Sequence, residues 1–374
     1  MEDKTMRIMH IAQSAGYGVT MYIEIIIRGL MNKEDILQYL LGSEYYNQPR
    51  FKKLVDKLIS IPMDREITKR DFLTILKCRN IIKQEHPDIV YCHSAKAGIY
   101  GRLACLGTST KVIYNPHGWA FNMKCGKLKK IFYKIVECGF AFITNKIICI
   151  SDYEKRTVPN IIPKRKLVVI KNGINIEQCK NLLAINKLTR EKLNIPPNAY
   201  VIGMIARISH QKGHDLFIQI AQKVKQRIPN AFFLIVGGKS DDIPIEELIE
   251  TANLSDCFHI TGEVNHAIQY ASLFDIAVLT SRWEGFGLVL PEYMVAKKPI
   301  IAYNVDAIPE IINHNINGLL VKPESIQEFT NAIYQIYSQP YFAHSLVENA
   351  SKIVAEKFDI KRVINEHETL FKQL

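Results

Sequence analysis

Short runs of apolar residues alternate with longer amphipathic stretches from one end of the chain to the other. In the first half, the runs that predict strands are 7–12, 38–42, 89–92, 111–115, 146–150 and 167–170. Amphipathic stretches such as 20–31 and 69–86 lie between these runs and predict helices. Strands that are apolar throughout and separated by helices are typical of a parallel sheet covered on both faces.

The same alternation starts again in the second half of the chain. The predicted strands are 200–206, 231–236, 258–261, 276–280 and 299–303, and the predicted helices are 214–227, 244–252, 288–296 and 326–338. A last helical stretch covers about 345–374. The pattern therefore predicts an α/β protein with two Rossmann-like, doubly wound domains, 1–180 and 181–355. The final segment, 356–374, is a candidate to pack back on the first domain.

Length and composition agree with two globular domains. The chain has 374 residues, of which 23% are charged and 48% belong to the apolar types, and one hydrophobic core rarely serves a chain of this size. The eight cysteines form no C-x-x-C pair, which is typical of reduced thiols in a cytoplasmic protein. We find no secretory leader, and no apolar run reaches the roughly eighteen residues needed to span a bilayer.

The positive charge of the chain lies in its first half. Residues 1–190 contain 32 Lys and Arg against 16 Asp and Glu, whereas the remainder has 16 against 21. This excess can be a solvated face, or it can bind an anionic bilayer or a polyanion such as nucleic acid. The segment 124–134 alternates lysines with Leu, Ile and Phe and predicts a basic amphipathic helix. That pattern favours peripheral binding to the inner face of the cell membrane.

The most informative motif is Ser-Arg-Trp-Glu-Gly-Phe-Gly-Leu-Val-Leu-Pro-Glu at 281–292, directly after a predicted strand. Gly285 and Gly287 let the backbone approach a ligand closely, and amides at the following helix start point toward an anion. Glu284 and Glu292 stand on the two sides of this turn. Carboxylates accept hydrogen bonds from sugar hydroxyls, so the motif predicts a ligand with sugars on both sides of its phosphates.

A second loop, 207–213, also follows a predicted strand and precedes a helix. Ligands of doubly wound sheets bind at such carboxyl ends of strands. Arg207 and Lys212 offer a planar fork and a point charge to one diphosphate. Two solvated loop cations are the alternative, which the presence of the 281–292 motif in the same chain makes less attractive.

Three loops of the first domain also follow predicted strands. Gly16 and Gly18 form a G-x-G turn without the third glycine, which is a weak dinucleotide motif. His117 follows the strand 111–115, so we expect it at the ligand-binding edge, although an isolated histidine is often only a packed residue. The segment 93–98, His-Ser-Ala-Lys-Ala-Gly, fits an acceptor contact and an ordinary strand-to-helix turn equally well.

These motifs resemble glycosyltransferase family 4, whose members have the GT-B architecture of two Rossmann-like domains facing a central cleft. The resemblance covers nearly the whole chain, and the Glu284 to Glu292 motif with the Arg207 and Lys212 pair carries most of it. It implies an acceptor-side first domain and a donor-binding second domain. The segments 93–98 and 116–121 further resemble bacterial enzymes of capsule, O-antigen and exopolysaccharide biosynthesis.

The resemblance implies a role for each candidate residue. Arg207 and Lys212 neutralise the donor diphosphate, Glu284 contacts the donor sugar, and Glu292 holds the ribose. His117 lies near the transferring carbon, so the implied catalytic residues are His117, Glu284, Arg207 and Lys212. The remaining implied donor contacts are Gly16, Gly18, Val264, Gly285, Phe286, Gly287 and Leu288.

The implied activity is transfer of a hexose or N-acetylhexosamine, with retention, from a nucleoside-diphosphate sugar to a lipid-linked saccharide. A UDP-sugar is the expected donor, no metal or other cofactor is expected, and the chain has no D-x-D motif. A sugar-nucleotide epimerase of similar shape and a non-enzymatic basic polyanion-binding protein are the alternatives. The acidic second half argues against nucleic acid as a partner.

Overall fold

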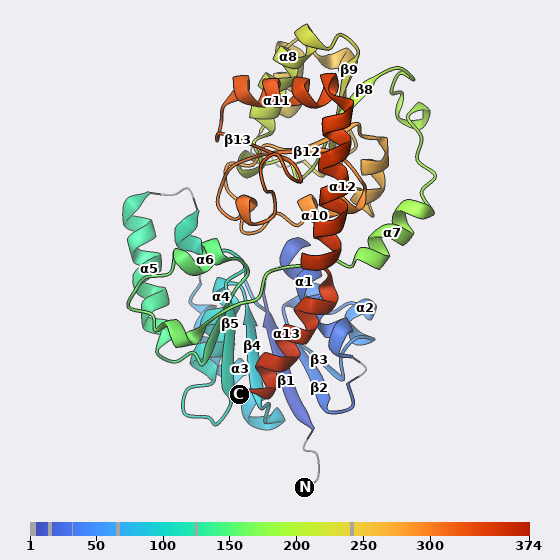
Figure 1. Cartoon of the computed structure of the whole chain (residues 1–374). Coiled ribbons are helices and arrows are strands. Elements are labelled where there is room, and N and C mark those ends of the chain that lie inside the picture. Colours follow the sequence, from blue (N-terminus) through green and yellow to red (C-terminus); the bar gives the residue numbers. More distant parts are fainter. Residues whose placement is uncertain (1–4, 14–16, 32, 65–67, 124–125, 240–242) are drawn as a thin grey trace. The chain divides into compact units, whose positions relative to one another are not determined.

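The computed structural model describes all residues except 1–4, 14–16, 32, 65–67, 124–125 and 240–242. The chain divides into two compact units. Unit 1 comprises residues 1–171 and 361–374, and unit 2 comprises residues 172–360 (Figure 1). The expected boundary between residues 180 and 181 falls inside a helix of unit 2 that spans Ile176–Ala184.

Unit 1 is built on a parallel sheet of seven strands in the order β3-β2-β1-β4-β5-β6-β7. The strands are β1 (Met6–Ala12), β2 (Ile36–Gly42), β3 (Lys57–Ser60), β4 (Ile89–His93), β5 (Lys111–Asn115), β6 (Lys146–Cys149) and β7 (Leu167–Val169). In β1, Ile8 is in register with Gln38 on one side and Ile89 on the other. This strand order is that of the doubly wound Rossmann fold.

The helices of unit 1 pack on the two faces of this sheet (Figure 1). They are α1 (Tyr17–Leu30), α2 (Pro49–Lys52), α3 (Arg70–Glu85), α4 (Ala95–Ala104), α5 (Lys127–Ala141), α6 (Asp152–Arg156) and α13 (Ile360–Lys372). Helix α13 comes from the end of the chain and packs closely on α1. A Cβ atom added to Gly29 would lie 2.2 Å from Ile364 Cδ1, so only glycine allows this approach.

Unit 2 repeats the plan with six parallel strands in the order β10-β9-β8-β11-β12-β13. The strands are β8 (Tyr200–Ile205), β9 (Ala231–Val236), β10 (Phe258–Ile260), β11 (Ile276–Leu279), β12 (Ile300–Tyr303) and β13 (Leu319–Val321). The helices are α7 (Ile176–Ala184), α8 (His214–Arg227), α9 (Ile245–Thr251), α10 (Val289–Val295), α11 (Ile326–Ser338) and α12 (Pro340–Lys357). All six residues of β9 are buried, as expected for a strand covered on both faces.

The single helix expected at about 345–374 is wrong, because the structure has two helices there. Helix α12 ends at Lys357 and α13 begins at Ile360. Between them, Ile174 N donates to Phe358 O at 2.8 Å and Ile360 N donates to Ile174 O at 2.9 Å. These backbone groups are bonded to a distant segment instead of to the helix, so the helix is interrupted.

The basic amphipathic helix expected at 124–134 is found at Lys127–Ala141, which is α5. Lys124 and Cys125 lie outside the described residues. Across the part of the chain that the structure describes, no helix is both long and apolar enough to cross a bilayer.

Candidate active site

Two loops meet at the carboxyl edge of the sheet in unit 2. One follows β8 and the other follows β11, and these two strands are paired with each other. Arg282 N donates to Gln211 O at 2.8 Å, and Gln211 Nε2 donates to Trp283 O at 3.1 Å. The structure therefore joins the two motifs that the sequence places about seventy residues apart.

Close backbone packing between these loops depends on glycine. Gly213 has a left-handed φ of 69°, and a Cβ atom there would lie 2.1 Å from Thr280 O. The hydroxyl of Thr280 lies 3.1 Å from Lys212 O and 3.0 Å from Gly213 O. In the second loop Gly287 has a φ of 94°, and a Cβ atom there would lie 2.8 Å from Ile308 Cδ1.

Lys212 and Glu284 form an ion pair at this junction. Lys212 Nζ lies 2.5 Å from Glu284 Oε1, and the Ser281 hydroxyl donates to the same oxygen at 2.6 Å. Glu284 N donates to Asp306 Oδ2 at 2.9 Å. The side chain of Glu284 is only 6% exposed. A carboxylate with this little water contact depends on its partners, so Lys212 holds Glu284 in place.

Arg282 ties the same two loops together from another side. Its guanidinium donates to both carboxylate oxygens of Asp215, at 2.8 and 2.5 Å, and to His210 O at 2.9 Å. Burial alone would raise the pKa of Asp215, but the hydrogen bonds and charge of Arg282 outweigh it and hold that pKa below its usual value. The sequence motif contains Arg282, yet only the structure gives it a partner.

The other predicted residues of unit 2 have different surroundings. Arg207 is exposed. Glu292, on α10, is half-buried, and burial raises its pKa to about 7. Phe286 is buried, with its ring centroid 6.0 Å from that of Phe358. Three further predicted contacts, Gly285, Leu288 and Val264, are half-buried.

Val264 follows β10, which is separated from β8 by β9. Its segment is nevertheless connected to the loop after β8, because Gly237 forms a bridge with Gly262 and Gly238 O accepts from Ile208 N at 3.0 Å. The predicted donor residues of unit 2 thus follow strands that lie next to one another or one strand apart.

In unit 1, His117 follows β5 and begins a chain of three histidine rings that contact one another through their nitrogens. His117 Nε2 lies 3.1 Å from His93 Nδ1, and His93 Nε2 lies 3.1 Å from His10 Nδ1. The three residues lie in or after the neighbouring strands β5, β4 and β1. A neutral imidazole donates through one nitrogen and accepts through the other, so the tautomers of the three rings are coupled.

A second polar cluster packs against His117. The ring of Tyr22 meets the ring of His117 edge-on, with centroids 4.7 Å apart. The hydroxyls of Tyr22 and Tyr91 lie 2.8 and 3.2 Å from His367 Nε2. His367 Nδ1 lies 2.7 Å from Val363 O. Since a carbonyl only accepts, Nδ1 carries the proton and Nε2 of the neutral ring accepts from tyrosine.

Burial keeps these histidines uncharged. It lowers the pKa of His10 and His117 to about 3 and that of His367 to about 4, and it holds the pKa of His93 well below the usual value. Repulsion between protonated rings lowers the pKa values of His10 and His117 further, because a proton on His367 would disfavour a second proton on either of them. His117 therefore meets its surroundings as a neutral imidazole at physiological pH.

Glu154 fixes the loop that carries His117. Its carboxylate accepts from Gly118 N at 2.8 Å and from Ile150 N at 2.6 Å. Burial raises the pKa of Glu154 to about 7. His117 has a left-handed φ of 53° and Gly118 a φ of 109°, so the loop needs such anchoring. The sequence analysis did not select Glu154, His10 or His367.

The remaining predicted residues of unit 1 are less informative. Gly16 lies outside the described residues, and Gly18 is exposed in the first turn of α1. In the segment 93–98, Lys96 Nζ lies 3.0 Å from Asp71 Oδ1 and donates to Asp64 O at 2.7 Å. Among the described residues, no group of three or more His, Cys, Asp or Glu could hold a metal ion.

Both units have the Rossmann-like fold that is found in glycosyltransferases of the GT-B class. Residues 18–178 match the family described as Glycosyltransferase Family 4, and residues 186–353 match the family described as Glycosyl transferases group 1. The two matched segments are consecutive glycosyltransferase domains, and the predicted family and fold class are confirmed.

Several relatives are bacterial enzymes. The chain is 27% identical over 310 residues to the UDP-Gal:alpha-D-GlcNAc-diphosphoundecaprenol alpha-1,3-galactosyltransferase of Escherichia coli, covering 81% of this chain and 79% of that one. It is 25% identical to the capsular polysaccharide biosynthesis glycosyltransferase CapM of Staphylococcus aureus, with 83% of each chain covered.

Solved structures share the fold. The Anabaena protein Alr3699/HepE in complex with UDP and glucose superposes with a TM-score of 0.82 at 21% identity, covering 99% of this chain and 100% of that one. A glycosyltransferase from Rickettsia africae superposes with a TM-score of 0.80 at 23% identity, covering 99% of this chain and 98% of that one.

We expect unit 1 to lose stability in acid because of its buried histidines. Folded pKa values of about 3 to 4 for His10 and His367 lie below the unfolded value of 6.5. The unfolded state therefore binds more protons as the pH falls from about 6.5 to 3. Each group costs up to about 1.4 kcal/mol per pH unit in that window.

Tryptophan fluorescence can measure this effect in unit 1 alone. The chain has 2 tryptophans, buried Trp119 in unit 1 and Trp283 in unit 2. In the Trp283→Phe variant, urea unfolding followed through Trp119 should show that the free energy of unfolding of unit 1 decreases as the pH is lowered from 7 to 5. His367→Gln keeps an acceptor for Tyr22 and should reduce the slope by about one proton. An unchanged slope in that variant would contradict the assignment.

Proposed function

We propose that the chain is a retaining glycosyltransferase that moves a hexose or N-acetylhexosamine from a UDP-sugar to a lipid-linked saccharide in cell-surface polysaccharide biosynthesis. The observation that carries this proposal is the ion pair between Lys212 and Glu284 at 2.5 Å, at the junction of two loops on the carboxyl edge of the sheet. A cation and a carboxylate side by side match a donor whose diphosphate adjoins a hydroxylated ring.

The donor diphosphate is bound by Lys212 and Arg207. As the sugar departs, negative charge grows on the leaving diphosphate, and cations that are already in position stabilise this charge more in the transition state than in the ground state. Lys212 is held in position by Glu284. Arg207 is exposed and takes part in no ion pair among the described residues, so its guanidinium is available to the ligand.

The two acids receive the sugars of the donor. Glu284 accepts from hexose hydroxyls through the oxygen that Lys212 and Ser281 do not occupy. Glu292 is half-buried, and its pKa is raised to about 7. Its carboxylate accepts hydrogen bonds from the ribose hydroxyls, which take the place of the water molecules that burial removes. The reaction needs no metal in this proposal.

His117 lies beside the anomeric carbon of the donor sugar in this proposal and is uncharged. Its ring is fixed by His93 at 3.1 Å and by Tyr22 edge-on. A neutral imidazole can exchange a hydrogen bond with the donor sugar without adding charge beside the oxocarbenium-like centre, where a positive charge would oppose the reaction. The lowered pKa of His117, about 3, keeps it in this state.

The acceptor is supported by the relatives and by the surface of α5. The name of the Escherichia coli relative includes a diphosphoundecaprenol acceptor. On α5 an exposed apolar stripe, Leu128, Ile131, Phe132 and Ile135, runs along the helix at spacings of three and four residues. Lysines flank it at 127, 129 and 134. We propose that this stripe lies on the anionic inner face of the cell membrane, where lipid-linked acceptors are found.

A panel of nucleoside-diphosphate sugars with a lipid-diphosphate saccharide tests the whole proposal. We expect turnover with a UDP-sugar and the acceptor, unchanged by a metal chelator. The anomeric configuration of the product, read by proton NMR, should be that of the donor. Inversion would contradict retention. An altered nucleotide sugar formed without acceptor would instead favour an epimerase.

Arg207→Ala should reduce turnover about 10²- to 10³-fold, because it removes one preorganised cation from the developing charge. Thermal unfolding should not change, since Arg207 is exposed. Lys212→Ala should reduce turnover as well, but it also strips the buried Glu284 of its partner and lowers the unfolding free energy of unit 2. Lys223→Ala, an exposed cation on α8, is the matched control. Near-normal turnover in Arg207→Ala would contradict the diphosphate assignment.

Phe132→Ser/Ile135→Ser should weaken binding to anionic vesicles by at least about tenfold, because two apolar side chains no longer leave water. Both side chains are exposed, 59% and 65%, so folding should be unaffected. Ile316→Ser/Tyr341→Ser removes two exposed apolar side chains from unit 2 and serves as the control. Equal sedimentation of both double variants with vesicles would contradict membrane binding through α5.

A further inference from the structure

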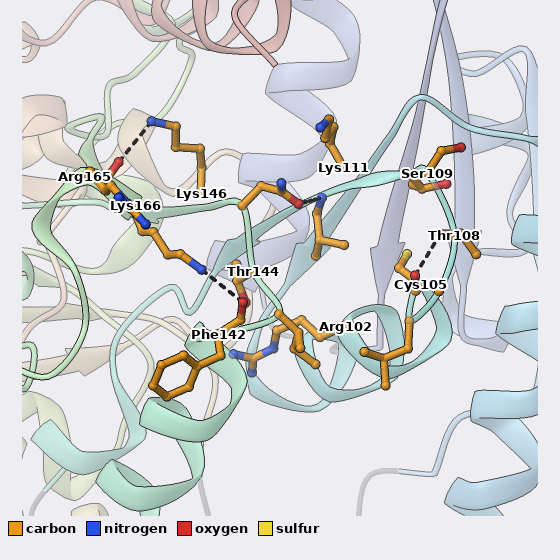
Figure 2. A pocket seen from close by; sticks show the side chains of 16 residues that line it. Arg102, Cys105, Thr108, Ser109, Lys111, Phe142, Thr144, Lys146, Arg165 and Lys166 are labelled. Atoms are coloured by element: carbon orange, nitrogen blue, oxygen red, sulfur yellow. Dashed lines mark hydrogen bonds between the residues drawn. The ribbon is translucent and has the colours of Figure 1, made fainter.

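A cavity of about 760 Å³ opens at the amino edge of the sheet in unit 1 (Figure 2). Lys111 and Lys146 are the first residues of β5 and β6, and Arg165 and Lys166 directly precede β7. Since these strands are parallel neighbours, their starts share one edge and bring the four cations around one space. His117 follows the opposite, carboxyl end of β5, so this cavity is distinct from the candidate active site.

The lining of the cavity is basic. It contains no carboxylate, and none of its cations Lys111, Lys146, Arg165 and Lys166 belongs to an ion pair within the described part of the chain. A fifth cation, Arg102, lies at the wall but is already paired with Glu137 at 2.9 Å. Burial and the nearby charge of Arg165 lower the pKa of Lys166. An anion in this space would relieve that repulsion.

Backbone carbonyls hold two of the lysines at the cavity. Lys146 Nζ donates to Arg165 O at 3.0 Å, and Lys166 Nζ donates to Ala141 O at 2.7 Å and Phe142 O at 3.1 Å. Each ammonium has three donors, so bonds remain for a ligand. Figure 2 shows Lys146, Arg165 and Lys166 on the side of Phe142, and Thr108 and Ser109 on the other side.

The cavity adjoins the apolar stripe of α5. Phe142 directly follows α5, lines the cavity and is 69% exposed. It stands seven residues beyond Ile135, two helical turns along the same stripe. A surface that offers apolar side chains next to a cluster of cations matches the layers of a membrane, where acyl chains lie beneath phosphates.

We propose that this cavity is a non-catalytic binding site for the phosphate headgroup of an anionic membrane lipid. The inference rests on the proposed membrane location of α5, and it adds a specific pocket to that apolar contact. Binding there would orient unit 1 on the bilayer while the carboxyl edge of its sheet stays free for the reaction. A nucleic acid would not use the exposed apolar side chains beside the cavity, so lipid is the occupant that the whole surface favours.

Lys146→Ala/Arg165→Ala tests the site with vesicles of phosphatidylcholine alone or with one-third phosphatidylglycerol. We expect the wild type to prefer the anionic vesicles and the double variant to lose about tenfold or more of that partition, since each cation near the surface contributes substantially. Lys223→Ala/Lys352→Ala removes the same charge from exposed positions of unit 2 and should change partition less than about twofold. Lys146→Arg/Arg165→Lys keeps both positive charges and should bind the anionic vesicles as the wild type does.

The outcomes separate this inference from the proposed function. If the wild type binds anionic vesicles through α5 and Lys146→Ala/Arg165→Ala binds equally well, the headgroup site is wrong while the membrane location stands. If the wild type binds no vesicles, both are wrong. Release from vesicles by millimolar inorganic phosphate, but not by chloride of equal ionic strength, would identify a free-phosphate site and overturn the lipid assignment. If the wild type binds an oligonucleotide tightly and Lys146→Ala/Arg165→Ala does not, the lipid assignment is wrong and the cavity binds a polyanion.

Turnover supplies an independent readout. Lys146 and Arg165 lie at the amino edge of the sheet, so the double variant should transfer sugar to a water-soluble acceptor at the wild-type rate. Its rate should fall only on acceptor presented in anionic vesicles. A loss of turnover with both acceptors, with folding intact, would contradict a non-catalytic role.

Discussion

The contact between the loops after β8 and β11 is the constraint on which the site in unit 2 depends. Gly213 packs so closely on Thr280 that a Cβ atom would come within 2.1 Å of its carbonyl oxygen. This approach brings Lys212 to Glu284 and allows Arg282 to clasp Asp215. A loop pulled back by one side chain would separate the cation from the acid. The ion pair between Lys212 and Glu284 therefore depends on the absence of a side chain at Gly213.

Much of this arrangement could be predicted from the sequence, because it depends on local patterns. Strands β9 and β11 of unit 2 are apolar throughout, and the Glu284 to Glu292 motif closely follows β11. The topology of a parallel sheet then places the ends of β8 and β11 side by side. The edge strands β3 and β13 were missed. β3 has a polar residue at each end and no buried residue, and β13 is an apolar run of only three residues directly after Asn317 and Gly318.

Features made by distant segments could not be predicted. His10 and His367 look like isolated histidines in the sequence, and only the sheet and α13 bring them toward His93 and Tyr22. The interruption between α12 and α13 is caused by Ile174, far away in the chain. In the sequence, Glu154 looks like any acidic residue of a short helix. In the structure, its carboxylate accepts hydrogen bonds from the backbone amides of Gly118 and Ile150 and so fixes the loop that carries His117. In each case the partner, and not the residue itself, defines the role.

The return of α13 to unit 1 has a consequence for how the chain matures. Ile364 fills the space over Gly29, His367 is buried beneath Tyr22, and Lys372 pairs with Asp35. Unit 1 therefore lacks part of its core until residues 361–374 have been synthesised, whereas unit 2 is one continuous stretch. Domains of most proteins fold in the order of their synthesis. Here unit 1 is translated first but can complete its fold only last. Until then, the core surface that α13 covers stays exposed while unit 2 can already fold.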